Sequence, residues 1–143
     1  MDLLLEGASY LLTSAREMGY KVIFINHQEE EGPFAPDNPL SQTVSELAPL
    51  ENETLIRISK LSPFFRTNLD QELKGIQNIV VAGIPTNLTV RMLVEEAYDR
   101  ELNIVLIEDL CYCYSEKIHD FTLDDLWETR PWVDILRLDD FFR

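Results

Sequence analysis

Short apolar runs rich in β-branched residues alternate along this chain with segments whose apolar residues recur at helical spacing. The runs are typical of strands covered on both faces, and the periodic segments are typical of amphipathic helices. The predicted strands are residues 21–26, 55–58, 78–83, 103–108 and 133–136. The predicted helices are residues 2–18, 69–73, 88–102 and 116–127. This alternation predicts an α/β fold with three layers (α/β/α) and a mostly parallel, Rossmann-like sheet.

The chain length and charge narrow the class of protein further. Its 143 residues correspond to one ordinary domain, so we predict a single domain over residues 1–143. The net charge of −14 comes from 26 acidic against 12 basic residues, and an acidic chain of this kind repels phosphate backbones. We therefore expect no nucleic-acid partner. No apolar run reaches the length of a membrane span, so none is expected to cross a membrane.

The two cysteines, Cys111 and Cys113, are separated by one residue. This spacing is one residue shorter than that of the usual redox or zinc pair, and no second pair exists to complete a zinc site. Two buried thiols in a reducing compartment such as the cytoplasm are the better interpretation. The first residues carry no basic region and no small-residue cleavage site, so they do not read as a signal peptide.

Two segments together resemble the isochorismatase-like hydrolase family. Residues 62–69 (SPFFRTNL) are similar to the family's Ser-Ala-Phe-x-x-Thr-x-Leu stretch, and residues 80–90 (VVAGIPTNLTV) are similar to its Gly-x-x-Thr-x-x-Cys-Val signature. The resemblance implies a cysteine nucleophile at a helix start, an aspartate base on the first strand and a nearby lysine. A helix N-terminus and a cation both lower a thiol pKa, so this combination is chemically sound.

This chain departs from that pattern at each catalytic position. The nucleophile position falls on Thr89, whose hydroxyl is a poor nucleophile without an adjacent base, and the lysine position falls on Ile58. Lys60 lies two residues further and would share a strand face with Ile58, so it is a possible substitute, although lysines are mostly exposed.

The turn from Gly83 through Ile84 and Pro85 to Thr86 matches the family's oxyanion turn, which contains a cis peptide. In the family one oxyanion donor is the backbone N–H of the residue aligned with Pro85, and proline has no N–H. Proline also lowers the cost of a cis bond, so the turn can keep its shape while it loses a donor. Thr86 is expected to bond backbone at the turn, Asn87 to cap the following helix, and His119 to cap or pack.

The family's first strand, which carries the aspartate, has no counterpart because this sequence opens directly with the first helix. In the family that strand lies in the middle of the sheet, between the strands equivalent to residues 21–26 and 78–83. We expect either that these two neighbours pair directly in a five-stranded sheet or that another segment or chain supplies a strand. A reduced sheet also favours association, so we expect a homo-oligomer or a subunit of a larger assembly.

His27 and Phe64 are the remaining candidate pocket residues. Some relatives place a metal-binding histidine where His27 stands, but only Glu29, Glu30 and Asp37 are near it in sequence, so we predict no metal and no cofactor.

Taken with the changes at the catalytic positions, the sequence favours a catalytically inactive domain, a pseudoenzyme, with a structural, assembly or small-ligand-binding role. The alternative is a diverged hydrolase that uses Thr89 to cleave C–N or vinyl-ether bonds.

Overall fold

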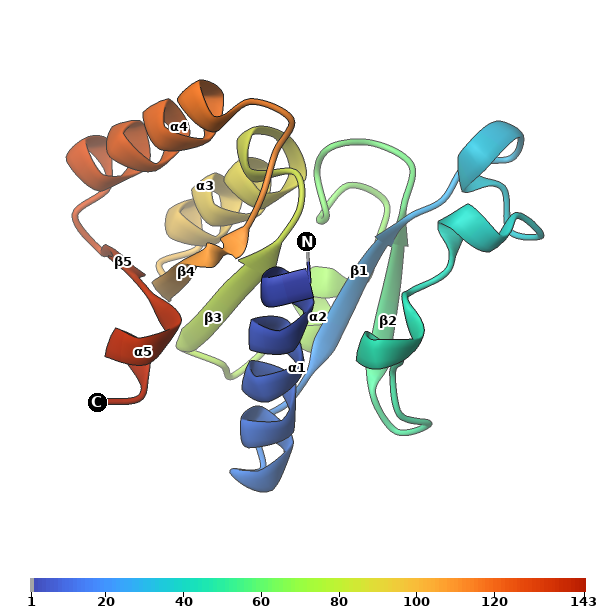
Figure 1. Cartoon of the computed structure of the whole chain (residues 1–143), viewed down its shortest axis with the longest axis horizontal. Coiled ribbons are helices and arrows are strands. Elements are labelled where there is room, and N and C mark those ends of the chain that lie inside the picture. Colours follow the sequence, from blue (N-terminus) through green and yellow to red (C-terminus); the bar gives the residue numbers. More distant parts are fainter. Residues whose placement is uncertain (1) are drawn as a thin grey trace. The chain divides into compact units, whose positions relative to one another are not determined.

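The computed structural model describes residues 2–143 and divides the chain into two compact units, Met1–Glu72 and Leu73–Arg143 (Figure 1). Strands in both units pair in parallel, with helices in each unit, as the sequence predicts for an α/β protein. The five strands form two sheets, one of two strands and one of three. The single five-stranded sheet, one of the two arrangements expected from the sequence, is therefore not formed. The assignment of the whole chain to one domain stays a prediction.

The first unit begins with an amphipathic helix, and Gly19 follows it with a φ of 74°, a conformation that ends helices. Strands β1 and β2 pair in parallel with residues 23–27 opposite residues 54–58. Between them the expected long loop contains three short 3-10 turns. The elements are α1 (Asp2–Glu17), β1 (Ile23–His27), η1 (Gly32–Phe34), η2 (Pro39–Ser41), η3 (Ser45–Leu47), β2 (Thr54–Ile58) and α2 (Leu69–Glu72).

One partly buried ion pair ties the end of α1 to the segment before β2. The Arg16 guanidinium donates to both carboxylate oxygens of Glu53, from Nε at 2.9 Å and from Nη2 at 2.6 Å. Arg16 also donates to the Ala48 carbonyl, and Glu53 accepts the Leu50 N–H at 2.7 Å. Only 7% of the Glu53 side chain is exposed, so this bidentate pair is better shielded than most surface pairs.

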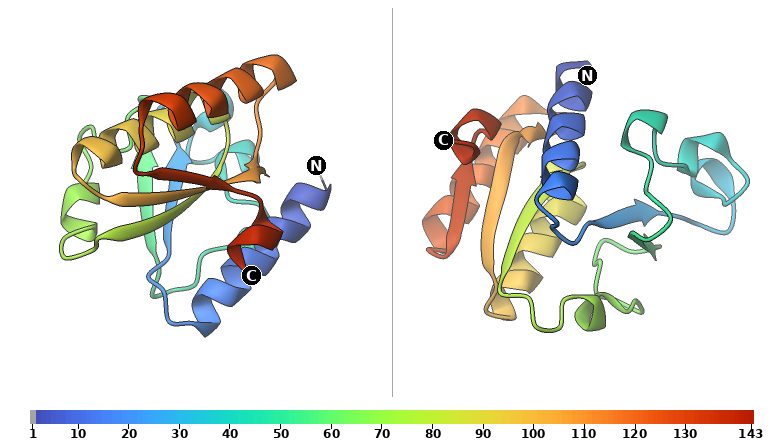
Figure 2. Two further views of the ribbon diagram at one scale, coloured as in Figure 1. Left: turned by 90° about the vertical axis from the view of Figure 1, so that its left-hand side faces the viewer. Right: turned by 90° about the horizontal axis from the view of Figure 1, so that it is seen from below.

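The second unit is a three-stranded parallel sheet in the order β3-β4-β5. Helices α3 and α4 lie over one face of this sheet, and the short helix α5 lies at the other (Figure 2, left). Its elements are β3 (Asn78–Gly83), η4 (Thr86–Val90), α3 (Arg91–Asp99), β4 (Asn103–Cys111), α4 (Glu116–Thr129), β5 (Val133–Leu136) and α5 (Leu138–Phe141). The apolar core lies between the sheet and the two longer helices, and it contains Val81, Val90, Val94, Ala97, Leu102, Ile104, Leu106, Cys111, Leu123, Leu126 and Val133.

Polar contacts connect the helices of this second unit to one another and to the sheet. Arg91 at the start of α3 bonds Asp125 of α4, and it also pairs with Glu95 at 3.1 Å. Glu95 in turn pairs with Arg130 at 3.2 Å, which extends the network past the end of α4. On the other face the Asp109 carboxylate accepts the Leu138 N–H at 2.9 Å, so a residue of β4 satisfies the first turn of α5.

The predicted elements are present, although several of their bounds are shifted by one to three residues. Helix α3 begins at Arg91 instead of residue 88, because a wide helical turn, η4, comes first. Strand β4 continues to Cys111 instead of residue 108, since its pairing with β3 reaches Gly83. Helix α5 was not predicted, because four residues are too few to show helical periodicity. Among the described residues, no helix has the length and apolarity needed to span a membrane.

Candidate functional site

The candidate residues of the second unit gather in the turn at the carboxyl end of β3, which is where ligand sites of parallel α/β sheets form. The Ile84–Pro85 peptide bond is cis. Gly83 has a φ of 144°, a backbone conformation that side chains rarely adopt. The Pro85 carbonyl accepts two N–H groups, those of Leu88 and Val90, each at 3.3 Å. The bond from Val90 spans five residues, one more than an α-helical bond, so the first turn is wide and α3 starts later.

Thr86 is the anchor of this turn. Its side chain is fully buried, and its N–H donates to the Tyr112 carbonyl at 3.0 Å. Its hydroxyl also forms a hydrogen bond of 2.8 Å with Nδ1 of the half-buried His119, on α4. The hydroxyl was expected to bond backbone at the turn, and the bond to His119 was not predicted. It joins residues 33 positions apart, and the only sequence signal for it was that both positions match the family.

Thr89, at the nucleophile position, has no such support. It is half-buried in η4, and its hydroxyl has no hydrogen-bond partner among residues 2–143. No imidazole or carboxylate is bonded to it, so nothing described in the structure would take its proton.

Asn87 does not cap α3, contrary to the sequence prediction, because it lies inside η4 and neither turn has a side-chain cap. Instead its Oδ1 is buried without a hydrogen-bond partner among the described residues.

A thiol does lie beside this turn, at the end of β4. Cys111 pairs in register with Gly83 and is buried. Burial raises the pKa of the Cys111 thiol to about 12, although a hydrogen bond from the Gly83 backbone opposes the shift. The thiol therefore stays protonated at neutral pH and is a poor nucleophile. Cys113 is also buried and donates to the Ser115 carbonyl at 3.2 Å, so the two thiols are buried and free, as the sequence suggests.

The candidate residues of the first unit lie at or beyond the carboxyl ends of β1 and β2. His27 and Ile58 are partners in the parallel register, and the Gln28 N–H donates to the Ile58 carbonyl at 2.7 Å. Ile58 is buried and apolar, so no charge occupies the lysine position. Lys60 is exposed and follows the end of β2, so the alternation that would place it on the same strand face as Ile58 does not extend to it.

Phe64 is buried in a short hydrogen-bonded loop after β2. The Ser62 hydroxyl accepts the N–H groups of Phe64 and Phe65, each at 3.2 Å, and the Thr67 hydroxyl donates to the Pro63 carbonyl at 2.6 Å. These bonds fix the loop locally through side chains that the sequence motif supplies. The pocket role expected for Phe64 stays a prediction.

His27 is held by its own neighbours. Its Nε2 lies 3.0 Å from Oε1 of Glu29, and its ring packs edge-on against Phe34 with 4.8 Å between centroids. The part of the chain that the structure describes contains no group of three histidine, cysteine or acidic residues placed to hold a metal ion.

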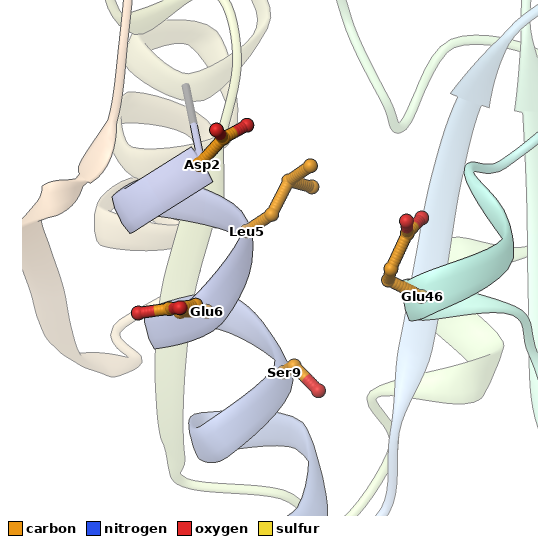
Figure 3. Close-up of a pocket in the computed structure, with 5 residues that line it drawn as sticks. All are labelled: Asp2, Leu5, Glu6, Ser9 and Glu46. Atoms are coloured by element: carbon orange, nitrogen blue, oxygen red, sulfur yellow. The ribbon is translucent and has the colours of Figure 1, made fainter.

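One hollow of the first unit lies away from the strand ends. It is lined on α1 by Asp2, Leu5, Glu6 and Ser9, and Glu46 faces them from η3 (Figure 3). Its volume is about 390 Å³, and all of its lining residues except Leu5 are acidic or polar. None of the residues expected to take part in chemistry lines this hollow.

Comparison with known proteins agrees with the resemblance of the motifs. A family model for the isochorismatase domain matches residues 2–130. The chain belongs to the isochorismatase family. It is 38% identical over 68 residues to the ureidoacrylate amidohydrolase RutB of Agrobacterium fabrum, a match that covers 46% of this chain and 30% of that protein. It is 27% identical over 120 residues to the uncharacterized isochorismatase family protein YddQ of Bacillus subtilis, covering 80% of this chain and 67% of that protein.

Solved structures of the family have the same fold. An isochorismatase-like hydrolase from Alkaliphilus metalliredigens superposes with a TM-score of 0.86 at 22% identity, covering 97% of this chain and 81% of the other. An isochorismatase family protein from Desulfovibrio vulgaris gives a TM-score of 0.89 at 19% identity, with 97% and 84% covered. The fold class and the family expected from the sequence are thus confirmed. The match spans only about a third of RutB, so that protein's activity does not transfer with the fold.

Proposed function

We propose that this chain is a catalytically inactive member of the isochorismatase family whose strand-end turn serves as architecture or as part of a small-ligand pocket. The observation that supports this most strongly is the environment of Thr89. Its hydroxyl has no hydrogen-bonding base among the described residues, and it stands where the family has a thiol. A threonine hydroxyl without a base is a poor nucleophile near neutral pH.

Three further features support the same proposal. Ile58 places a buried apolar side chain at the lysine position, so no cation there can lower a pKa or steady a developing charge. Pro85 has no N–H to donate to an oxyanion. The nearby thiol of Cys111 has a pKa raised to about 12 and does not replace the missing nucleophile. The members of a catalytic unit act together, so the loss of one already removes most of the rate.

The architectural part of the proposal is supported by Thr86. The turn keeps a fully buried threonine that is bonded to both the Tyr112 carbonyl and His119. These bonds hold the backbone of the turn in place and require no catalytic residue. The buried, free thiols also fit a reducing compartment such as the cytoplasm. An assembly role, with the chain as a homo-oligomer or a subunit, belongs to the same proposal.

A diverged hydrolase is the competing proposal, and one observation favours it. The Thr89 hydroxyl is not engaged by any other described group, so it is free to react if a base is supplied. The similarity to RutB, named as a ureidoacrylate amidohydrolase, indicates a C–N bond as its target. Lys60 would then have to act as the base, although it is exposed and lies beyond the end of β2.

A hydrolysis assay on the purified chain separates the two proposals. The substrates are ureidoacrylate and an isochorismate-type vinyl ether, and the proteins are the wild type, Thr89→Ala and Lys60→Ala. An inactive domain predicts the same background rate for all three proteins. Turnover by the wild type that is lost in Thr89→Ala and in Lys60→Ala would establish the diverged hydrolase instead.

A further inference from the structure

Positive charge is concentrated in the segment that contains β2 and the loop after it. Residues 54–69 carry three basic residues, Arg57, Lys60 and Arg66, and no acidic one. No other stretch without an acidic residue holds more than two basic residues, in a chain whose net charge is −14. A local excess of positive charge on an acidic protein attracts anions to that place.

These three cations are not neutralised by the protein itself. Seven of the 12 basic residues pair with a carboxylate, namely Arg16, Lys21, Arg91, Arg100, Arg130, Arg137 and Arg143. Arg57, Lys60 and Arg66 are exposed, and none of them has a carboxylate partner among residues 2–143. Glu29, which follows the neighbouring strand β1, is bonded to His27 instead.

The backbone of Arg66 is unusual. Its φ is 52°, in the left-handed region that residues other than glycine adopt at a cost. Glu101, with a φ of 63°, shares this conformation, but there the Leu102 N–H donates to the Ala97 carbonyl at 3.2 Å, as in a Schellman helix cap. Arg66 does not follow a helix, so no helix cap accounts for its backbone. A large side chain kept at such a position indicates that the side chain has a role.

The side chain of Arg66 is placed to receive an anion. Its guanidinium carbon lies 5.0 Å from the centroid of the Phe65 ring, a cation–π contact that restrains it. Its N–H donors bond no other described group, and the fork that they form matches a carboxylate or a phosphate. Leu61 and Phe65 are 44% and 47% exposed, so apolar surface accompanies the cations. The Ser62 hydroxyl, bonded to the Phe64 and Phe65 N–H groups, fixes the loop.

We propose that the loop of residues 59–67 binds a small molecule that carries a carboxylate or phosphate group beside an apolar body. Arg66 donates hydrogen bonds to the anionic group, Lys60 adds a second positive charge, and the apolar body lies against Leu61 and Phe65. The loop begins at the carboxyl end of β2, and ligand sites of parallel α/β sheets form at such ends.

The net charge favours a small anion over an anionic membrane as the occupant. A chain with a net charge of −14 is repelled by an extended anionic surface, whereas a small anion meets mainly the local field of the loop. The inference uses residues of the first unit alone, and it does not depend on whether the chain is catalytic.

An NMR titration of the full chain, which follows the backbone amide shifts as a ligand is added, tests the proposal. The probes are benzoate, phenyl phosphate and the neutral benzamide. Both anions should shift the amides of residues 60–67, and benzamide should not. The tighter of the two anions identifies the preferred group. Binding of either anion should weaken as salt is added, because salt screens the attraction.

Two variants and a control locate the binding. Arg66→Gly removes the guanidinium and suits the left-handed backbone, so affinity should fall at least about tenfold while the melting temperature does not fall. Lys60→Gln should weaken binding by a smaller factor, because a lysine acts as a point charge. The matched control is Lys117→Gln on α4, since Lys117 is also exposed and has no carboxylate partner among the described residues. It should leave the affinity unchanged.

Three results would overturn the proposal. The first is a titration in which neither anion shifts the amides of residues 60–67. The second is an Arg66→Gly protein that binds the anions as tightly as the wild type, or a Lys117→Gln protein that loses as much affinity, since binding would then follow the overall charge. The third is a wild type that binds vesicles containing phosphatidylserine but neither small anion, which would assign the loop to a membrane surface.

Discussion

Replacing Thr86 by valine tests whether the turn after β3 is held by its bond to His119. Valine keeps the shape of threonine but removes the hydroxyl, so Nδ1 of the half-buried His119 loses a partner 2.8 Å away, where the fully buried side chain of residue 86 presents a methyl group instead. Leaving a buried polar group without its partner costs about 1–3 kcal/mol. For a chain of this size about 1 kcal/mol lowers the melting temperature by about 3 °C, so a fall of about 3–9 °C is expected.

The control is Thr122→Val in α4. Thr122 is also buried, but its hydroxyl donates to the Ile118 carbonyl of its own helix, and that carbonyl keeps its place in the helical ladder. The free energy of unfolding, from urea denaturation, should therefore fall less in Thr122→Val than in Thr86→Val. A double-mutant cycle with His119→Ala should give a coupling of at least about 0.5 kcal/mol. Equal losses in the two threonine variants, or no coupling to His119, would refute the reasoning.

Two further predictions concern the Arg16–Glu53 pair and the buried thiols. The hydrogen bond from Arg16 lowers the Glu53 pKa below its ordinary value of 4.5, so the pair stabilises the fold above that pH and loses its effect as the pH falls through the lowered value. Glu53→Gln should thus lower the free energy of unfolding, measured by urea denaturation at pH 7, by about 1–2 kcal/mol. The difference in this free energy between the variant and the wild type should shrink in acid. A difference that does not depend on pH would contradict the prediction. Cys111 has a pKa raised to about 12, and both cysteines are buried. Neither should therefore react rapidly with a thiol reagent at pH 8 until the chain is unfolded. Rapid labelling of the folded protein would contradict the burial of these thiols.

Local patterns predicted the elements because each is specified by neighbouring residues. β3 and β5 have the predicted bounds, and in β3 the apolar run ends at a glycine. β4 was predicted to end at Glu108 because the carboxylates there interrupt its apolar run, but pairing with β3 carries it on to Cys111. The start of α3 was missed for a related reason, because the Pro85 carbonyl accepts two N–H groups and rearranges the first turn.

The parts of the site that sequence could not supply depend on contacts between distant residues. The bond between Thr86 and His119 spans 33 positions, and no local pattern marks it. The division of five strands into two sheets is likewise a matter of pairing, which apolar runs do not encode. The substitutions at Thr89, Ile58 and Pro85 could be read from the letters, because they fall within motifs of fixed spacing.

The central claim is that the turn is kept while several parts of the catalytic unit are lost together. The most direct test is the hydrolysis rate of Thr89→Cys on ureidoacrylate. Restoring the thiol alone leaves a buried isoleucine at the lysine position and no N–H at Pro85, so the rate should equal that of Thr89→Ala. A rate at least about a hundredfold above that background would contradict the account, because it would mean that only the nucleophile had been lost.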